Sequence, residues 1–322
     1  MMARASGIAV LLLAVLLLYS GAEVGALQST MKVLRETDPG TDIDDAWAIA
    51  FTIAHAGFEP LGITVTDADT PARARLACKL LHLTGKNIPV AVGRQTPTPA
   101  GRVDHQFSWA EDFTAKRPVK KPAADFIVEI VKRYPGEVTL IAVGPLQNIA
   151  DALRREPQLG RYVKRVVLMS GCIYGTADRP TPRAEWNVVA STADSQLVYA
   201  AGLPLTIVPL DATTLVLLSD EEREQVRRYS SPLTHALEAL YRLWLSGPRA
   251  RMTLHDQLAV AEAASPGTYF SKKEILPIIV DDEGFTRIDK IKGKPVEVCL
   301  EPKREEFMKY YISRLVGQRL GM

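Results

Sequence analysis

Residues 38–45 read Asp-Pro-Gly-Thr-Asp-Ile-Asp-Asp, after a β-like run at residues 32–35 and before an apolar run at 46–51 that predicts a helix. Four carboxylates this close repel one another, so they stay ionised together only in open water or around a cation. Helix capping by Asp42 and Asp44 is the alternative, but it accounts for one or two acids and not for four. The stretch therefore predicts a cation site at the carboxyl end of a strand, where open α/β sheets bind their ligands.

Clustered aspartates are the usual source of the 6–8 oxygen ligands that Ca²⁺ takes. An EF-hand loop is excluded, because the glycine at its sixth position and its closing glutamate are missing. A phosphohydrolase with an aspartate nucleophile would need an Asp-x-Asp spacing at the strand end, whereas Pro39 and Gly40 follow Asp38.

Apolar β-like runs alternate with helical periodicities along most of the chain. We predict strands at residues 33–37, 61–66, 88–92, 138–143, 165–169 and 205–210, with helices between them at 46–56, 71–83, 122–133, 146–154 and 192–201. This alternation predicts an α/β fold with an open, mainly parallel central sheet flanked by helices, Rossmann-related in its layout. A helical region (219–229, 232–246 and 255–264), a small β tail (275–280, 285–288 and 296–300) and a closing helix (304–320) follow.

The composition limits the class of protein. The chain has 322 residues, is 47% hydrophobic and carries a net charge of +2, and no long basic stripe favours a nucleic-acid partner. Arg4 precedes an apolar run at residues 8–19, which predicts a signal peptide at 1–26, export to the periplasm or the outside, and one domain at 27–322. An uncleaved N-terminal anchor is the alternative. The three cysteines fit neither a disulfide framework nor a zinc pattern.

Other segments carry polar groups next to predicted strands or helices. His255 and Asp256 begin a predicted helix, where Asp256 could simply be a cap. Glu185 and Asn187 flank Trp186, so they could present two hydrogen-bonding groups to a polyhydroxylated ligand while the ring packs inward, or form a turn. Residues 65–69 place two more acids at a strand end, and 142–150 break at a Gly-Pro pair where a backbone carbonyl could serve as an oxygen ligand. The proline-rich stretch at 96–121 is long for a connector and typical of a lid.

Together and in this order, these segments resemble the nucleoside hydrolase family, the inosine–uridine-preferring N-ribohydrolases, from about residue 31 to the C-terminus. The motifs that carry the resemblance are Asp38-Pro39-Gly40 with Asp44-Asp45-Ala46, Gly144-Pro145-Leu146-Gln147-Asn148-Ile149-Ala150, and Ala184-Glu185-Trp186-Asn187. The sequence departs from the family in three places: Asp42-Ile43 lengthens the first motif, Ala68-Asp69 stands where many members have Gly-Asn, and residues 101–113 lack a His-Gly-Glu motif, for which His105 and Trp109 are the possible substitutes.

The resemblance implies a role for each matching residue. It implies that a buried Ca²⁺ is held by Asp38, Asp45, Asp256 and the backbone carbonyl of Val143. It also implies that the ribose is bound by Asp44, Asp69, Glu185 and Asn187. Asp42 receives no role of its own.

The implied reaction is hydrolysis of the N-glycosidic bond of a ribonucleoside, or a related ribosyl compound, by metal-activated water. Asp38 is then the expected general base and His255 the expected proton donor to the leaving base. Tyr241 and Trp244 could stack on the base, or belong to the core of their helix. A homodimer or homotetramer is expected from the family. The alternatives are a non-catalytic calcium-dependent nucleoside- or sugar-binding protein of the cell envelope and a metal phosphohydrolase.

Overall fold

The computed structural model describes residues 30–247 and 251–317, so the predicted leader at 1–26 lies outside the described residues. All described helices and strands belong to the unit Met31–Met322. The strands of this unit are β1 (Met31–Thr37), β2 (Phe58–Val65), β3 (Val90–Val92), β4 (Val138–Ala142), β5 (Val163–Met169), β6 (Leu205–Val208), β7 (Phe270–Val280), β8 (Thr286–Ile288) and β9 (Lys294–Pro302).

Helices connect most of these strands. They are α2 (Asp44–Ala54), α3 (Thr70–Leu83), α4 (Ala123–Arg133), α5 (Gln147–Arg155), α6 (Trp186–Val189), α7 (Thr192–Ala200), α8 (Leu210–Thr213), α9 (Asp220–Arg228), α10 (Pro232–Leu245), α11 (His255–Ala264) and α12 (Arg304–Val316), with 3₁₀ turns η1 (His105–Ala110) and η2 (Leu159–Arg161).

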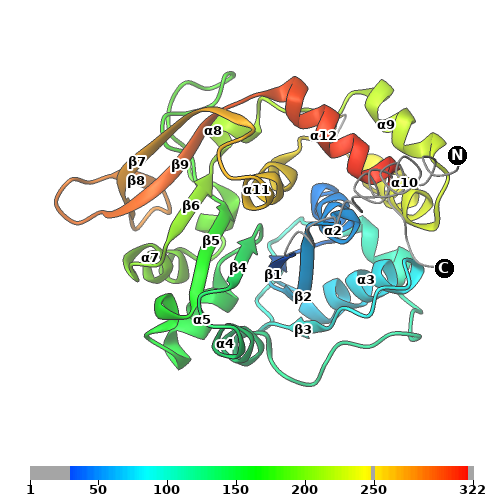
Figure 1. The fold of residues 1–322 in the computed structure, drawn as a ribbon, viewed down its shortest axis with the longest axis horizontal. Helices are drawn as coiled ribbons and strands as arrows, with labels where there is room; N and C mark the ends of the chain where they lie inside the picture. Colours follow the sequence, from blue (N-terminus) through cyan, green and yellow to red (C-terminus); the bar gives the residue numbers. More distant parts are fainter. Residues whose placement is uncertain (1–29, 248–250, 318–322) are drawn as a thin grey trace, which may run out of the picture. The chain divides into compact units, whose positions relative to one another are not determined.

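The strands form one sheet in the order β3-β2-β1-β4-β5-β6-β9-β7-β8 (Figure 1). The pairs from β3 to β9 are parallel, whereas β7 runs antiparallel to β9 and β8. The predicted open, mainly parallel sheet is therefore confirmed. The C-terminal β tail belongs to the same sheet, because β9 pairs with β6 through Thr206 and Ile207.

The chain order places a ligand-binding crevice beside β1. From β1 the chain runs to β2 and β3 on one side, and it then returns to β4 on the other side. Glu36 of β1 pairs with Thr64 of β2 and Ala142 of β4, and its carbonyl accepts a hydrogen bond of 3.0 Å from Val143 N. The carboxyl ends of β1 and β4 thus lie side by side at a topological switch point, where α/β sheets bind ligands.

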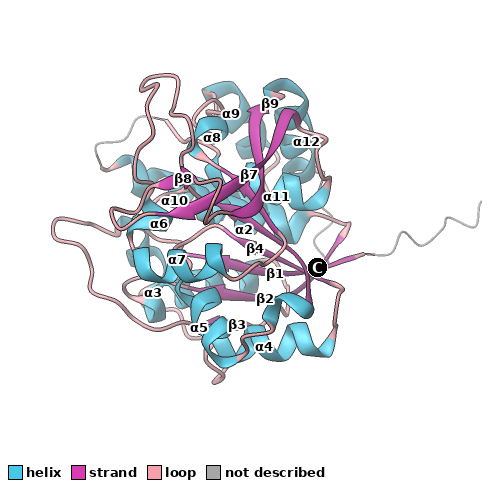
Figure 2. Ribbon diagram, turned by 90° about the vertical axis from the view of Figure 1, so that its left-hand side faces the viewer, coloured by secondary structure: helices cyan, strands magenta, loops and turns pink. Residues whose placement is uncertain are grey.

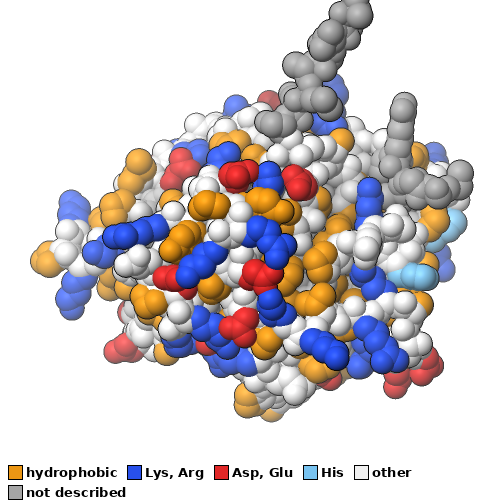
Figure 3. Space-filling model, turned by 60° about the horizontal axis from the view of Figure 1, so that its bottom comes forward, with side chains coloured by type: hydrophobic (Ala, Val, Ile, Leu, Met, Phe, Trp, Pro, Cys, Tyr) orange, Lys and Arg blue, Asp and Glu red, His pale blue; other side chains and the backbone are white. Residues whose placement is uncertain are grey.

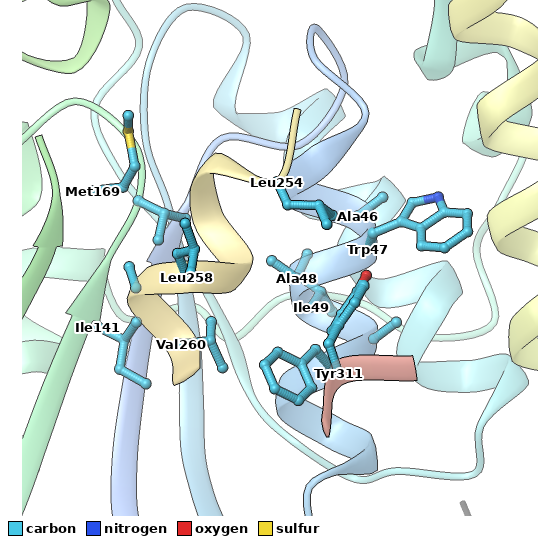
Figure 4. Close-up of a cluster of buried hydrophobic side chains, with 14 of the residues drawn as sticks. Ala46, Trp47, Ala48, Ile49, Ile141, Met169, Leu254, Leu258, Val260 and Tyr311 are labelled. Atoms are coloured by element: carbon cyan, nitrogen blue, oxygen red, sulfur yellow. The ribbon is translucent and has the colours of Figure 1, made fainter. Parts of the chain in front are cut away.

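Helices cover both faces of the sheet (Figure 2). Because strand side chains alternate between faces, Val33 and Ile141 pack in the core with α2 and α11, whereas Leu34 and Leu140 pack in the core with α4 and α5. Figure 4 shows the first of these cores, where Ala46 of α2 lies near Leu254, the residue just before α11, and Leu258 of α11 lies on the side of Ile141 and Met169. This apolar packing fixes the N-termini of α2 and α11 relative to each other.

The surface carries charges of both signs. On the face shown in Figure 3, Lys and Arg side chains are interspersed with Asp and Glu and with hydrophobic side chains. Among the described residues, no helix combines the length and the apolar character that a bilayer span requires.

The structure departs from the sequence-based expectation in a few local places. Helix α2 begins at Asp44, so two of the clustered acids stand in its first turn. The strand predicted at 205–210 ends at Val208, because Pro209 precedes the short helix α8. Four short elements, η1, η2, α6 and α8, were not predicted. The closing helix ends at Val316, and residues 318–322 lie outside the described ranges.

Candidate active site and metal centre

Three buried carboxylates meet where α2 and α11 begin. Asp44 and Asp45 stand in the first turn of α2, Asp256 stands in the first turn of α11, and one oxygen of each lies within 4.8 Å of the others. Gln257 ties the two helices together, since its Nε2 donates a 2.8 Å hydrogen bond to Asp44 O. Asp45 and Asp256 of the expected ligand set belong to this group, Asp44 joins them, and Asp38 is not one of its three members.

The electrostatics of this cluster favour a bound cation. Burial raises the pKa of Asp256 well above its usual value, and the neighbouring Asp44 and Asp45 raise it further. Burial also raises the pKa of Asp44 and Asp45. Asp256 Oδ2 is buried without a hydrogen-bond partner, and the buried Arg35 guanidinium lies 4.0 Å from it. A divalent ion with oxygen ligands would relieve this repulsion, so the cluster could hold a metal ion.

Asp38 lies just beyond the end of β1 and is closely surrounded. Asp38 N and Thr37 Oγ1 donate hydrogen bonds of 2.9 and 2.5 Å to Asp45 Oδ1, so the strand end orients the Asp45 carboxylate. Asp38 Oδ2 lies 3.8 Å from Arg73 Nη2. A Cβ at Gly144, just beyond β4, would lie only 2.6 Å from Asp38 Oδ1, so only glycine leaves room for this carboxylate.

Glu185 and Asn187 form a second polar group, which contacts Val143 through Asn187. Asn187 Nδ2 donates hydrogen bonds of 2.8 and 3.1 Å to the carbonyls of Val143 and Met169. Glu185 accepts hydrogen bonds of 2.8 and 3.0 Å from the backbone N–H groups of Asn187 and Gly171. Burial nonetheless raises the pKa of Glu185 to about 7. This carboxyl group can therefore either donate or accept a hydrogen bond near neutral pH.

A cavity of about 760 Å³ joins these groups, a size typical of small-molecule sites. The expected site residues that line it are Asp38, Asp44, Asp45, Val143, Glu185, Asn187, His255 and Asp256. His255 stands at the start of α11, where its Nδ1 lies 2.7 Å from Thr213 Oγ1. Segments far apart in the sequence thus converge on one site.

Asp69 is the exception among the expected site residues. Its carboxylate accepts a 3.0 Å hydrogen bond from Ala72 N and caps α3, it is exposed, and it does not line the cavity. The ribose contact expected for Asp69 has no support in this geometry. The buried acid of this segment is Asp67, which pairs with Arg73 and Arg102 at 3.2 and 2.6 Å.

The aromatic residues divide between cavity and core. Trp244 lines the cavity, whereas Tyr241 is buried between Trp47 and Trp244, with ring centroids 6.2 and 5.3 Å away, and does not line it. Trp186, expected to pack inward, lines the cavity and is 45% exposed. His105 also lines the cavity, whereas Trp109 does not.

Sequence reasoning missed two arginines that line the cavity, Arg102 and Arg183. Each stands in a polar loop without periodicity, so no local pattern marks either residue. It also missed Arg73, which is fully buried beneath the Asp-Pro-Gly turn although it lies in a helix with many polar residues. Only long-range contacts reveal these side chains.

Comparison with known proteins identifies relatives along almost the whole described unit. A family model described as "Inosine-uridine preferring nucleoside hydrolase" matches residues 33–309. The chain is 30% identical to "Uridine nucleosidase 1" of Arabidopsis thaliana, over 77% of this chain and 78% of the relative. It is 31% identical to "Non-specific ribonucleoside hydrolase RihC" of Salmonella paratyphi C, over 83% of this chain and 90% of the relative.

Solved structures agree on the fold. A plant nucleoside hydrolase, PpNRh1, superposes with a TM-score of 0.78 at 23% identity, covering 89% of this chain and 99% of that one. A purine-preferring ribonucleoside hydrolase from Gardnerella vaginalis gives a TM-score of 0.76 at 23% identity, covering 89% and 98%. From the family match and the relatives together, this chain belongs to the inosine-uridine preferring nucleoside hydrolase family and is an N-ribosyl hydrolase.

Proposed function

We propose that this protein hydrolyses the N-glycosidic bond of ribonucleosides, to ribose and free base, with a bound Ca²⁺ and with Asp38 as the general base. One observation carries the proposal: a single cavity is lined by the buried acidic cluster, by Asp38, and by the candidate sugar-binding and proton-donating side chains Glu185, Asn187 and His255. The family membership supports the reaction.

The donor set supports a hard cation. Asp44, Asp45 and Asp256 offer only carboxylate oxygens, which suit Ca²⁺ and Mg²⁺ better than metals that prefer nitrogen or sulfur. We propose that Asp38 and the Val143 carbonyl add further oxygens, because Ca²⁺ takes 6–8 of them. A bound ion of this kind would lower the pKa of a water ligand and orient it.

Asp38 is then the residue that accepts the proton of the attacking water. It reaches the cavity from the end of β1, beside the acidic cluster, and Arg73 lies within 4 Å of its carboxylate. Direct attack by water from the face opposite the base would invert the configuration at C1′, as in inverting glycosidases. No covalent bond to the enzyme is needed.

The ribose hydroxyls would be held by Asp44, Glu185 and Asn187. Asn187 donates its amide N–H groups to the carbonyls of Val143 and Met169, so its Oδ1 could accept a hydrogen bond from a sugar hydroxyl. Asp44 and Glu185 line the same cavity, so both could accept hydrogen bonds from the sugar hydroxyls. Fixing the sugar in this way turns binding energy into geometry for the attack.

His255 is our candidate for the proton donor to the leaving base. It adjoins Asp256 on the rigid start of α11, and its Nδ1 contact with Thr213 fixes the ring. Nε2 is the other ring nitrogen, and a protonated imidazole could donate from it to a nitrogen of the leaving base.

For substrates, we propose uridine and inosine as the first compounds to test. The family description names both, and the relatives quoted above include a uridine nucleosidase and a non-specific ribonucleoside hydrolase. Trp186 and Trp244 give the cavity two aromatic walls, which suit either a pyrimidine or a purine.

The test is release of reducing sugar from uridine and inosine by the purified protein, before and after chelation and after Ca²⁺ or Mg²⁺ is added back. We expect turnover that disappears with the chelator and returns best with Ca²⁺. Asp38→Asn should abolish turnover while the circular dichroism spectrum stays unchanged. Full activity in the chelator would refute the metal role, and near-normal activity of Asp38→Asn would refute the general-base role.

We further propose that residues 1–26 are a signal peptide, that the protein is exported, and that it forms a homodimer or homotetramer. The apolar run at 8–19 supports export. N-terminal sequencing of the protein from an expressing cell and light scattering of the purified protein test these two proposals. A mature chain beginning at Met1 or a monomer would contradict them respectively.

A further inference from the structure

Five side chains form a closed ring that joins the long loop at residues 93–104 to the Asp-Pro-Gly turn. We call it the ion-pair ring, and its members are Thr41, Asp67, Arg73, Arg102 and Asp104. Arg102 donates to Asp104 Oδ1 at 2.9 Å and to Asp67 Oδ2 at 2.6 Å. Arg73 Nη2 donates to the same Asp67 oxygen at 3.2 Å and to Thr41 Oγ1 at 3.2 Å. Thr41 Oγ1 closes the ring by donating to Asp104 Oδ1 at 2.5 Å.

The ring reaches the proposed general base through Arg73. Arg73 Nη1 donates to Pro39 O at 3.1 Å and also to Asp38 O, while its Nη2 lies 3.8 Å from Asp38 Oδ2. Arg73 is fully buried, so these bonds are shielded from water and their geometry is fixed. A shift of Arg73 therefore moves the backbone that carries Asp38.

Two residues of η1, directly after the loop, also contact the turn. Gly40 has a φ of +132°, and a Cβ there would lie 2.1 Å from Cε1 of Phe107 in η1, so the Phe107 ring rests directly on the turn. Gln106 Nε2 donates a 2.7 Å hydrogen bond to Asp42 O. Residues 99–103, which precede Gln106 and Phe107 in the chain, form one wall of the cavity.

The charges within the ring balance. Two guanidinium groups face two carboxylates, and the side chains of Arg102 and Asp67 are only 8% and 4% exposed. Removing one charge leaves its partner buried without compensation, whereas removing one of each sign keeps the ring neutral. This balance offers a direct way to test whether the ring acts as one unit.

We propose that Arg102 is a positioning residue for the hydrolytic reaction: by sharing the Asp67 carboxylate with Arg73, it holds residues 93–104 as a wall of the substrate cavity and fixes the turn that carries Asp38. The kinetic part of this inference rests on the proposed function, whereas the structural part does not. Arg102 itself acts through Asp67 and Arg73.

The first test compares Arg102→Gln with Arg94→Gln. Arg94 is a matched control, because it stands in the same loop and also pairs with two carboxylates, Asp151 and Asp194, but does not line the cavity. We expect Arg102→Gln to lower kcat and to raise KM for the nucleoside, with kcat/KM falling about tenfold to a hundredfold. Arg94→Gln should stay within about twofold. Arg102→Lys keeps the charge and should recover part of the loss.

The second test is a double-mutant cycle with Asp67→Asn. Each single variant leaves one unbalanced charge, so the charge-balanced double variant, Asp67→Asn with Arg102→Gln, should lose less kcat/KM than the product of the two single losses. Multiplicative losses would refute the ring as a unit. Circular dichroism confirms that each variant is folded, and Arg102→Lys serves if a neutral variant fails to fold.

Hydrogen–deuterium exchange decides the structural part without any turnover. In Arg102→Gln we expect faster exchange both at residues 99–107 and at residues 38–45, whereas Arg94→Gln leaves 38–45 unchanged. Faster exchange in the loop alone, with kcat unchanged, would show that Arg102 merely anchors the loop and would overturn the proposal. If the unaltered protein shows no turnover, the proposed function fails, and the exchange data still decide the coupling between loop and turn.

Discussion

Replacing Gly144 by Ala is the most local way to disturb the proposed general base. The added Cβ would lie 2.6 Å from Asp38 Oδ1 and 2.8 Å from Thr66 Cγ2. Asp38 would have to retreat by about 0.8 Å, the difference between 2.6 Å and the 3.4 Å at which ordinary contact begins. Because Thr66 also crowds the added Cβ, moving Asp38 alone would not relieve the clash.

A displacement of this size is large for a reacting group. A misplacement of 1 Å can cost about 10²-fold in rate, so we expect kcat to fall between about tenfold and a hundredfold. Overpacking of this kind also costs about 1–3 kcal/mol of stability, which leaves most domains folded. The expected result is therefore a folded protein with a much lower kcat.

The assay is initial-rate release of ribose from uridine at saturating Ca²⁺, with a urea unfolding curve for each variant. Gly160→Ala is the matched control, because a Cβ at that position would have 3.4 Å to its nearest neighbour. A Gly144→Ala enzyme with kcat within twofold of the unaltered protein would refute the packing argument. Equal losses in both variants would point to a general effect of removing a glycine.

Three further results are expected. His255→Ala should lower kcat by about 10²–10⁴-fold on uridine but much less on p-nitrophenyl riboside, whose leaving group needs no proton; equal losses on both would exclude His255 as the acid. In the presence of a chelator, Glu185→Gln should remove one part of the pH dependence of the unfolding free energy. The Glu185 carboxyl has a pKa that rises from 4.5 to about 7 on folding, so it stabilises the protein fully below pH 4.5, and this contribution is lost as the pH rises to about 7. The unfolding free energy of the unaltered protein, measured in urea, should therefore fall by up to about 3 kcal/mol relative to Glu185→Gln between pH 4.5 and 7.5, and parallel curves would contradict the buried carboxyl. Ca²⁺ at a hundred times its Kd should raise the unfolding free energy by about 2.7 kcal/mol in the unaltered protein and not in Asp256→Asn, as calorimetry can show.

Local sequence patterns were sufficient for most of the fold. A continuous buried run predicted β4 and the apolar second half of β5, because burial on both faces selects apolar residues. β1 is less apolar, since Lys32, Arg35 and Glu36 stand within it. The placement of β9 beside β6 left no trace in composition, since strand order depends on contacts between distant segments. The end of β6 was misplaced because Leu210 is as apolar as a strand residue, although Pro209 already turns the chain.

For the site, too, local sequence patterns were sufficient for some residues and contacts between distant segments decided the others. Asp38, Asp44 and Asp45 stand in one motif whose charge density by itself indicates a cation site, whereas the roles of Asp256, Glu185 and Asn187 came from the resemblance. Asp69 was chosen by its position in a motif, but a left-handed backbone at Asp67 and Ala68, with φ of 69° and 49°, turns the chain so that Asp69 caps α3 instead. Arg73 and Arg102 could not be predicted, because the contacts of Arg73 with Pro39 and of Arg102 with Asp67 join segments 34 and 35 residues apart.

Both edges of the sheet end in three-residue strands, β3 (Val90–Val92) and β8 (Thr286–Ile288). So short an edge presents few unpaired backbone N–H and C=O groups along which a second chain could align. The short β3 and β8 therefore disfavour addition of strands from other molecules along these two outermost strands. Association of copies through helices and loops would leave every strand pairing of the sheet intact when that association is disrupted.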